Sequence, residues 1–159
     1  MRVVVLGIGN VLMSDEGIGV HAVDALQKRF ALHDDVEVID GGTTGMELLP
    51  DLEGAQYLVV IDAVRVGKPA GSVVRLEGDE VPAFFKTKLS PHQVGLSDVL
   101  AALRFSGGAP DHVILIGVQP ASLDMGMDLS PTVAARMDEV LDLVTTELAT
   151  IGVPARALV

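Results

Sequence analysis

Short apolar runs alternate with helically spaced apolar residues along this chain. Val3–Leu6 and Tyr57–Ile61 are near-continuous apolar runs of strand length, and Val113–Gly117 is a third. Ile18–Phe30 instead repeats its apolar residues at the spacing of one helical face. Strands buried on both faces are continuously apolar, and their alternation with helices is typical of βαβ units. We therefore expect an α/β fold with a twisted, mostly parallel mixed sheet and helices on both faces.

Turn and cap signals predict the remaining elements. The expected strands are Val36–Ile39 and Ser72–Leu76, and a short helix is expected over Gly45–Leu52. A serine followed by proline is typical of a helix start, which predicts helices from Ser90-Pro91 to about Phe105 and from Ser130-Pro131 to about Ile151. The tight Gly/Pro turn at 67–71 predicts that strand 72–76 pairs antiparallel with the strand before it. The length of 159 residues suits one domain over 1–159.

Composition excludes several classes of partner. The chain carries 22 acidic and 11 basic residues, for a formal net charge of −11, which repels nucleic acid and anionic lipid. Cysteine is absent, so disulfides, thiolate ligands and a cysteine nucleophile are excluded. No apolar stretch is long enough to cross a bilayer. We expect a cytoplasmic protein without nucleic-acid partners or membrane insertion.

Three ligand-type side chains occur where an α/β fold brings chain segments together. Glu16 follows the first apolar run, Asp62 ends the run Tyr57–Ile61, and His92 lies in the first turn of a predicted helix. Two carboxylates and an imidazole suit a divalent transition metal and leave coordination positions open for a substrate. A helix N-terminus also disfavours the imidazolium, which keeps His92 able to bind metal. The other histidines, His21, His33 and His112, are assigned structural roles.

The first loop invites a different interpretation. Gly7-Ile8-Gly9-Asn10 begins like a dinucleotide-binding loop, but Leu12 stands where the third glycine is required. Asp15 and Glu16 would also repel a pyrophosphate at the following helix N-terminus. We assign Asp15 to the dipole of that helix. Glu16 is left open between a dipole partner and a ligand.

A second loop, Asp40-Gly41-Gly42-Thr43, follows the strand Val36–Ile39. Paired glycines allow positive φ and the close approach of another chain, and Asp40 suits the anchoring of a turn. An extended ligand crossing the carboxyl edge of the sheet would pass this loop. The H-E-x-x-H and G-x-S-x-G signatures of zinc proteases and serine hydrolases are both missing.

Together, these segments resemble the [NiFe]-hydrogenase maturation endopeptidases. The resemblance is carried in the family's order by GIGNVLMSDEGIG at 7–19, DGGTTG at 40–45, IDAV at 61–64, SPHQVGLSDVL at 90–100 and GVQP at 117–120. It implies a single α/β domain, a catalytic and metal-contacting trio of Glu16, Asp62 and His92, and substrate recognition by Asp40. Gly41, Gly42 and Thr43 belong to the same recognition loop.

The resemblance also implies the reaction and the partner. These enzymes cut a short C-terminal extension from a hydrogenase large-subunit precursor that already carries nickel. The nickel ion, or another divalent metal in its place, would arrive with the substrate, which fits a chain without cysteine ligands. As a hypothesis, the metal polarises the scissile carbonyl or activates a water that one of the two carboxylates positions.

Two other functions are compatible with parts of the pattern. A non-catalytic nickel carrier would use the same trio. A receiver-type domain would be phosphorylated on Asp62, but it needs a lysine before a proline after its last strand, and here Gln119 precedes Pro120. Asp15 and Glu16 also lie well beyond the tip of the first strand, which counts against that reading.

Overall fold

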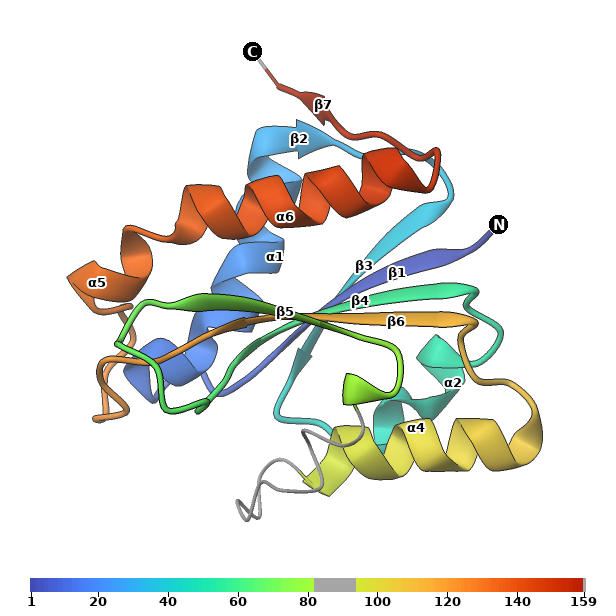
Figure 1. Ribbon diagram of the computed structural model, residues 1–159, viewed down its shortest axis with the longest axis horizontal. Helices are drawn as coiled ribbons and strands as arrows, with labels where there is room; N and C mark the ends of the chain where they lie inside the picture. Colours follow the sequence, from blue (N-terminus) through green and yellow to red (C-terminus); the bar gives the residue numbers. More distant parts are fainter. Residues whose placement is uncertain (82–93, 159) are drawn as a thin grey trace.

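Five strands form the central sheet of the computed structural model, which describes residues 1–81 and 94–158. The strands are β1 Val3–Ile8, β3 Val36–Gly42, β4 Tyr57–Ala63, β5 Val73–Glu77 and β6 His112–Val118. Their order is β3-β1-β4-β6-β5 (Figure 1). The first four strands in this order pair parallel, and β5 pairs antiparallel with β6. The predicted mostly parallel mixed sheet is confirmed.

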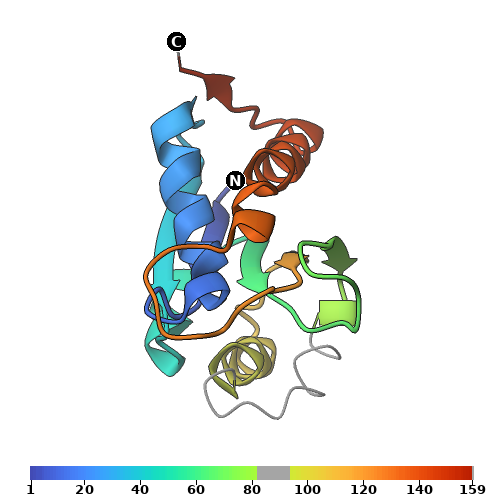
Figure 2. The ribbon, with the colours of Figure 1, turned by 90° about the vertical axis from the view of Figure 1, so that its left-hand side faces the viewer.

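Helices cover both faces of this sheet. They are the 3-10 turns η1 Ser14–Gly17 and η2 Met46–Leu48, and the α-helices α1 Ile18–Arg29, α2 Leu49–Leu52, α4 Val94–Ser106, α5 Pro131–Ala134 and α6 Met137–Thr150. α1 and α6 lie on one face and α2 and α4 on the other (Figures 1 and 2). β2 Phe30–Ala31 and β7 Arg156–Ala157 form a small antiparallel pair that was not predicted. Within the described residues no helix has the length and hydropathy of a membrane span; the cytoplasmic location stays a prediction.

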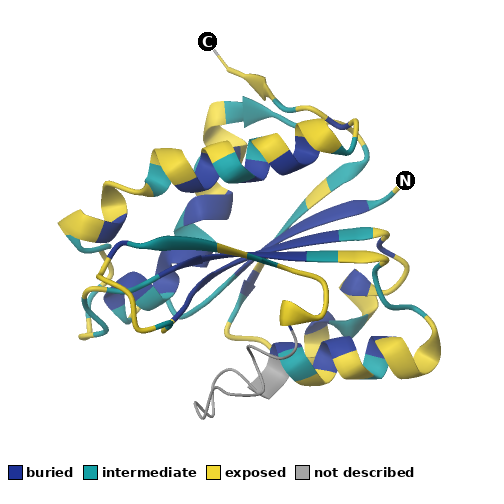
Figure 3. Cartoon of the chain, viewed as in Figure 1, coloured by how far each residue is buried: buried dark blue, intermediate teal, exposed yellow. Residues whose placement is uncertain are grey.

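Each face of the sheet carries its own aliphatic core. Along β4, Val59 and Ile61 pack with α1 and α6, whereas Leu58 and Val60 pack with α2 and α4. All four side chains are fully buried, as the dark blue centre of Figure 3 shows. Burial on both faces explains why the central strands are continuously apolar in sequence.

The predicted pairing of the fourth strand was wrong. β5 pairs with β6 and not with its predecessor β4, because β6 occupies that edge of β4 along the whole of Tyr57–Ala63. The connection before β5 is fixed to the segment after β6 instead. Gly71 N–H donates to the carbonyl of Gln119 (2.8 Å), and Gln119 N–H donates to that of Ser72 (2.8 Å).

The last predicted helix exists in two pieces. Its cap is confirmed, because Ser130 Oγ accepts from Val133 N–H at 3.3 Å and Pro131 is the first helical residue. At Arg136 the backbone N–H bonds three residues back, to the Val133 carbonyl, and this tighter turn separates α5 from α6. The other predicted cap, Ser90-Pro91, lies outside the described residues.

The start of α1 approaches the sheet so closely that there is no room for a side chain at Gly19 or Gly7. A Cβ on Gly19 would lie 2.1 Å from the Ile61 carbonyl oxygen and 2.4 Å from that of Ile8. A Cβ on Gly7 would lie 2.2 Å from the carbonyl oxygen of Gly19. The start of α1 is therefore pressed against the ends of β1 and β4, which fixes the position of the preceding loop.

Replacing Gly19 by alanine is expected to destabilise the fold by about 2–3 kcal/mol, because overpacking against rigid backbone carries costs of this order. Helix propensity alone predicts the opposite sign, a gain of up to about 1 kcal/mol. Urea unfolding at neutral pH measures the change. Gln27→Ala, at an exposed position of the same helix, is the control and should stay within about 0.5 kcal/mol of wild type. A Gly19→Ala variant as stable as wild type would contradict the close contact.

Candidate active site

Three parallel strands end side by side at the carboxyl edge of the sheet, where β1 lies between β3 and β4. Gly7 of β1 pairs with Asp40 of β3 on one side and with Ile61 of β4 on the other. Asp40 and Asp62 therefore flank the end of β1. Open α/β sheets bind their ligands at this edge.

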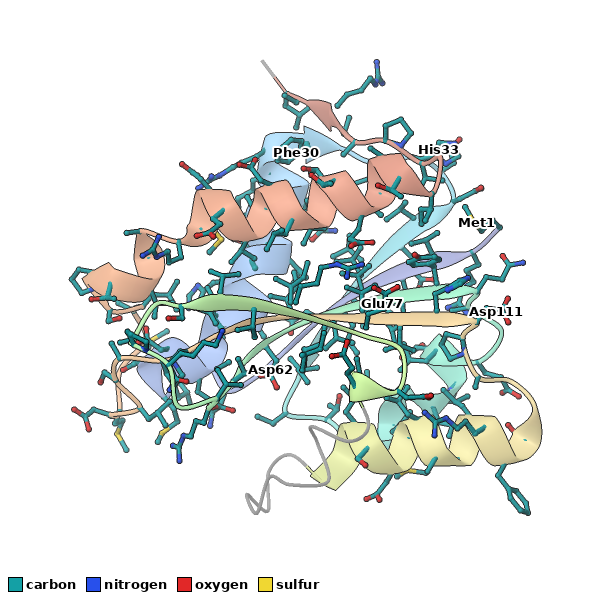
Figure 4. All side chains as sticks on the ribbon, viewed as in Figure 1. Met1, Phe30, His33, Asp62, Glu77 and Asp111 are labelled. Carbon is teal, nitrogen blue, oxygen red and sulfur yellow. The ribbon has the colours of Figure 1, made fainter. Side chains whose placement is uncertain are left out.

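Asp62 lies inside β4, because the strand continues to Ala63 beyond its predicted end at Ile61. Its side chain is buried, with 1% of its surface exposed. Strand alternation puts Asp62 on the same face as Val60 and Val64, which belong to the core under α4. Figure 4 shows Asp62 on this side of the sheet. A carboxylate in this position is shielded from bulk water at the edge where the strands end.

Glu16 reaches the same edge from η1, the single turn that precedes α1. Gly9, with φ of +135°, follows β1 and packs directly against η1. A Cβ on Gly9 would lie 1.9 Å from the Glu16 carbonyl oxygen. η1 also contacts β4, the strand that carries Asp62. The Glu16 side chain is partly exposed. The structure thus brings Glu16 and Asp62 to one edge on elements that touch.

His92, the third predicted ligand, lies outside the described residues. Within residues 1–81 and 94–158, no group of three histidine, aspartate or glutamate side chains gathers as a metal site. The trio of Glu16, Asp62 and His92 therefore stays a prediction. Two carboxylate donors at one edge suit a divalent cation that a third, nitrogen ligand would complete.

Hydrogen bonds hold the loop that carries Asp40 in place beside β1. Asp40 Oδ1 accepts from Gly42 N–H at 3.0 Å, and the Gly42 carbonyl accepts from Gly9 N–H at 2.8 Å. β3 extends through Gly42, past its predicted end, and its register against β1 shifts so that Gly41 is an extra, bulged residue. Gly42 has φ of +49°, and a Cβ on Gly41 would lie 2.9 Å from Leu6 Cδ1, so the predicted need for glycine is confirmed. Asp40 and Thr43 remain exposed.

Asp15 has a role that its sequence position did not reveal. Its carboxylate is fully buried and accepts four hydrogen bonds, from the backbone N–H groups of Ala121, Ser122 and Ser130 and from the Ser130 hydroxyl, at 2.8–2.9 Å. The prediction that Asp15 serves the dipole of α1 was therefore wrong. Burial alone would raise the pKa of Asp15, but these hydrogen bonds to the charged form outweigh it and lower the pKa. Asp15 fastens the loop after β6 to the loop that carries Glu16.

Two of the other histidines have the structural surroundings expected of them. The ring of His112 packs on Tyr57 with 4.8 Å between centroids. His33 is exposed, and its Nδ1 accepts from Asp35 N–H at 3.0 Å. His21 is a partly buried residue of α1.

Comparison with known proteins decides the family. The sequence profile described as HycI, hydrogenase maturation protease, matches residues 20–147. The chain belongs to the hydrogenase maturation protease family. It is 49% identical over 156 residues to the hydrogenase 2 maturation protease of Escherichia coli, covering 98% of this chain and 95% of that protein. The chain is therefore a peptide hydrolase, and the carrier and receiver-domain alternatives are set aside.

Solved structures of this protease family share the fold. The hydrogenase maturating endopeptidase HybD from E. coli superposes with a TM-score of 0.95 at 47% identity, covering 99% of this chain and 98% of that one. The [NiFe] hydrogenase maturation protease HybD from Thermococcus kodakarensis gives a TM-score of 0.76 at 29% identity, covering 92% and 99%. The α/β architecture predicted from the sequence is that of the family.

Replacing Asp15 by asparagine is expected to destabilise the protease by about 2–3 kcal/mol, since hydrogen bonds to a charged group each contribute roughly 1.5–3 kcal/mol. The asparagine amide also replaces one acceptor oxygen with an NH2 group, which is a donor and would face the N–H donors of the loop. Because the folded pKa lies below the ordinary value of 3.8, the ionised carboxylate stabilises the fold above that value. The stabilisation is lost as pH falls through the folded pKa.

Urea unfolding of wild type and Asp15→Asn at neutral pH and below pH 3.8 tests both points. The difference in unfolding free energy between wild type and Asp15→Asn should reach its full size at neutral pH and become smaller in acid. Asp128→Asn, which changes an exposed acid of the same loop, is the control and should leave stability within about 0.5 kcal/mol at neutral pH. A difference that does not change with pH would contradict the role of the Asp15 charge.

Proposed function

We propose that this protease removes the C-terminal extension from a nickel-loaded [NiFe]-hydrogenase large-subunit precursor. Glu16, Asp62 and His92 would contact the nickel ion that the precursor carries, or another divalent metal in its place. The observation that supports this most directly is the presence of Glu16 and Asp62 at the carboxyl edge, on elements in contact. The similarity to the solved [NiFe] hydrogenase maturation protease HybD from T. kodakarensis supports the same substrate class.

The two carboxylates have different surroundings and suit different tasks. Asp62 is 1% exposed, so it is suited to a fixed contact that excludes water. Glu16 is partly exposed and within reach of solvent, so it suits the positioning of the attacking water as a general base. A metal ion in the bound precursor would polarise the scissile carbonyl. A requirement for that ion would make the enzyme a metal-dependent protease, and cleavage without it would make the enzyme an aspartic-type protease.

Asp40 is proposed to recognise the substrate, together with Gly41, Gly42 and Thr43. One oxygen of Asp40 is used within the turn, while the side chain as a whole is exposed. The bulge at Gly41 and the bond between Gly42 and Gly9 hold the loop beside the end of β1. A preorganised loop carrying one exposed charge suits contact with an extended segment of a partner.

Incubation of the purified enzyme with two forms of the precursor tests the dependence on nickel. We expect the nickel-loaded large subunit to lose its extension and the nickel-free form to stay intact, measured by the mass of the large subunit. Cleavage of both forms at equal rates would contradict recognition of the ion. Cleavage of neither form would contradict the proposed substrate.

Glu16→Gln and Asp62→Asn are expected to lower kcat about a hundredfold or more on nickel-loaded precursor, the usual range for loss of an acid–base group. His92→Ala should lower nickel-dependent cleavage as well. Glu47→Gln neutralises an exposed acid of η2 and is the matched control, with kcat unchanged. An undiminished rate for Glu16→Gln would remove Glu16 from the mechanism.

Asp40→Asn keeps the oxygen that accepts from Gly42 but removes the charge. We expect KM for the precursor to rise roughly tenfold, the size of one charge-assisted contact, while kcat and the unfolding midpoint stay the same. Steady-state cleavage over a range of precursor concentrations measures the two constants separately. A change in kcat alone would contradict a role in recognition.

A further inference from the structure

The loops at the carboxyl edge expose large apolar side chains next to the candidate active site. Met125 is 88% exposed, Met127 68% and Leu12 55%. We call these three residues the apolar rim. Leu12 precedes Glu16 by four residues, and Met125 and Met127 lie in the loop after β6. A water-exposed group of large apolar side chains is typical of a surface that binds another protein.

Backbone hydrogen bonds bring the two loops of the apolar rim together. Gly126, between the two methionines, donates its N–H to the Leu12 carbonyl at 2.9 Å and accepts from Ser14 N–H at 2.8 Å. Residues 9–17 and 120–130 lie side by side in Figure 2 as the blue and orange loops. The apolar rim is therefore a single surface built from segments far apart in the sequence.

This surface is held in place. Ser14 has φ of +52°, which is unfavourable for a residue with a side chain. Its Oγ donates to the Asp124 carbonyl at 2.6 Å, and the buried Asp15 carboxylate binds the N–H groups of Ala121 and Ser122. Because the backbone under the methionines is fixed, their exposure is a property of the fold. A fixed backbone lowers the entropy lost on binding, and flexible methionine side chains adapt to a partner.

Charge around the apolar rim indicates the kind of partner. Asp124 and Asp128 stand on either side of the two methionines, and both are exposed. Asp15 is also near, but its charge is buried and already satisfied by four hydrogen bonds. A partner that complements this surface presents apolar side chains with lysine or arginine beside them.

We propose that the apolar rim is the docking surface for an apolar segment of the hydrogenase large-subunit precursor that carries flanking basic side chains. This inference rests on the proposed function for the identity of the partner. The apolar rim adjoins η1, which carries Glu16, so a precursor bound there is held beside the candidate active site. Docking of this kind contributes binding energy away from the scissile bond and is expressed in KM.

The test uses the double variant Met125→Gln/Met127→Gln with nickel-loaded precursor. We expect KM to rise about tenfold or more, as for the loss of an interface hot spot, with kcat and the unfolding midpoint unchanged. Phe105→Gln is the matched control. Phe105 is 96% exposed, but it lies near the end of α4 that is farthest from the carboxyl edge. The KM of the Phe105→Gln variant should therefore equal that of wild type. An unchanged KM for the double variant would overturn the proposal.

A second variant, Asp124→Asn/Asp128→Asn, tests the charge of the partner. It keeps the Asp124 backbone carbonyl that accepts from Ser14. We expect a two- to threefold rise in KM at low salt and a weaker dependence of KM on salt than in wild type, because exposed charges are screened. An unchanged dependence on salt would overturn the basic character of the partner.

Two outcomes separate this inference from its alternatives. If wild type fails to cleave the precursor, the proposed function fails, whatever the methionine variants do. If wild type cleaves and the methionine variant cleaves with equal KM but changes from dimer to monomer in sedimentation, the apolar rim is a contact between two copies of this chain. That result would overturn precursor docking while leaving the proposed function intact.

Discussion

Direct contact between the backbone of α1 and the ends of two strands is the constraint on which the site depends. A Cβ on Gly19 would clash with the carbonyl groups of Ile8 and Ile61, so only glycine lets the start of α1 lie this close to β1 and β4. In the short segment from Gly9 to η1, the Glu16 carbonyl packs close to Gly9, where a Cβ would lie 1.9 Å from it. Asp62 follows Ile61 directly. The relative position of the two carboxylate-bearing segments is therefore set by glycine contacts, independently of any ligand.

A second interaction, the burial of the Asp15 carboxylate, extends this rigid region to the loop after β6. Four hydrogen bonds compensate for the cost of removing this charge from water. The adjacent residues Asp15 and Glu16 thus differ in their surroundings, since Asp15 is buried and fastens a distant loop, whereas Glu16 is partly exposed. Ser130 takes part in both the Asp15 network and the start of α5, so the C-terminal helices are tied to the same point.

The parts of the structure that the sequence predicts well are those set by local pattern. Val3–Leu6 and Tyr57–Ile61 are continuously apolar because both faces of the strand are covered, and Ser130-Pro131 starts a helix through its own side chain. Parallel strands end at one edge, which is why Glu16 and Asp62 were expected near each other. The DGGT loop was also recognisable from its paired glycines.

What the sequence predicts poorly depends on partners far along the chain. The carboxylate of Asp15 binds groups 106 to 115 residues away, so nothing in its neighbourhood distinguishes it from a helix-dipole acid. The turn before β5 looks like a hairpin, yet β6, which comes later in the chain, takes the place beside β4. The apolar rim likewise joins Leu12 to Met125 and Met127 only after folding. Leu12 lies far from the two methionines in sequence, so no local periodicity marks the three residues as one surface.

The three acids at the carboxyl edge differ in exposure, and this difference orders their roles. Asp62 is buried, Glu16 is partly exposed and Asp40 is exposed. A carboxylate that has already lost its water interacts more strongly with a cation than one in solvent, because the local dielectric is lower. An exposed carboxylate contributes more to the encounter and the register of a partner. Exposure falls from Asp40 through Glu16 to Asp62, which suits Asp40 to the first contact with a protein substrate and Asp62 to a contact from which water is excluded.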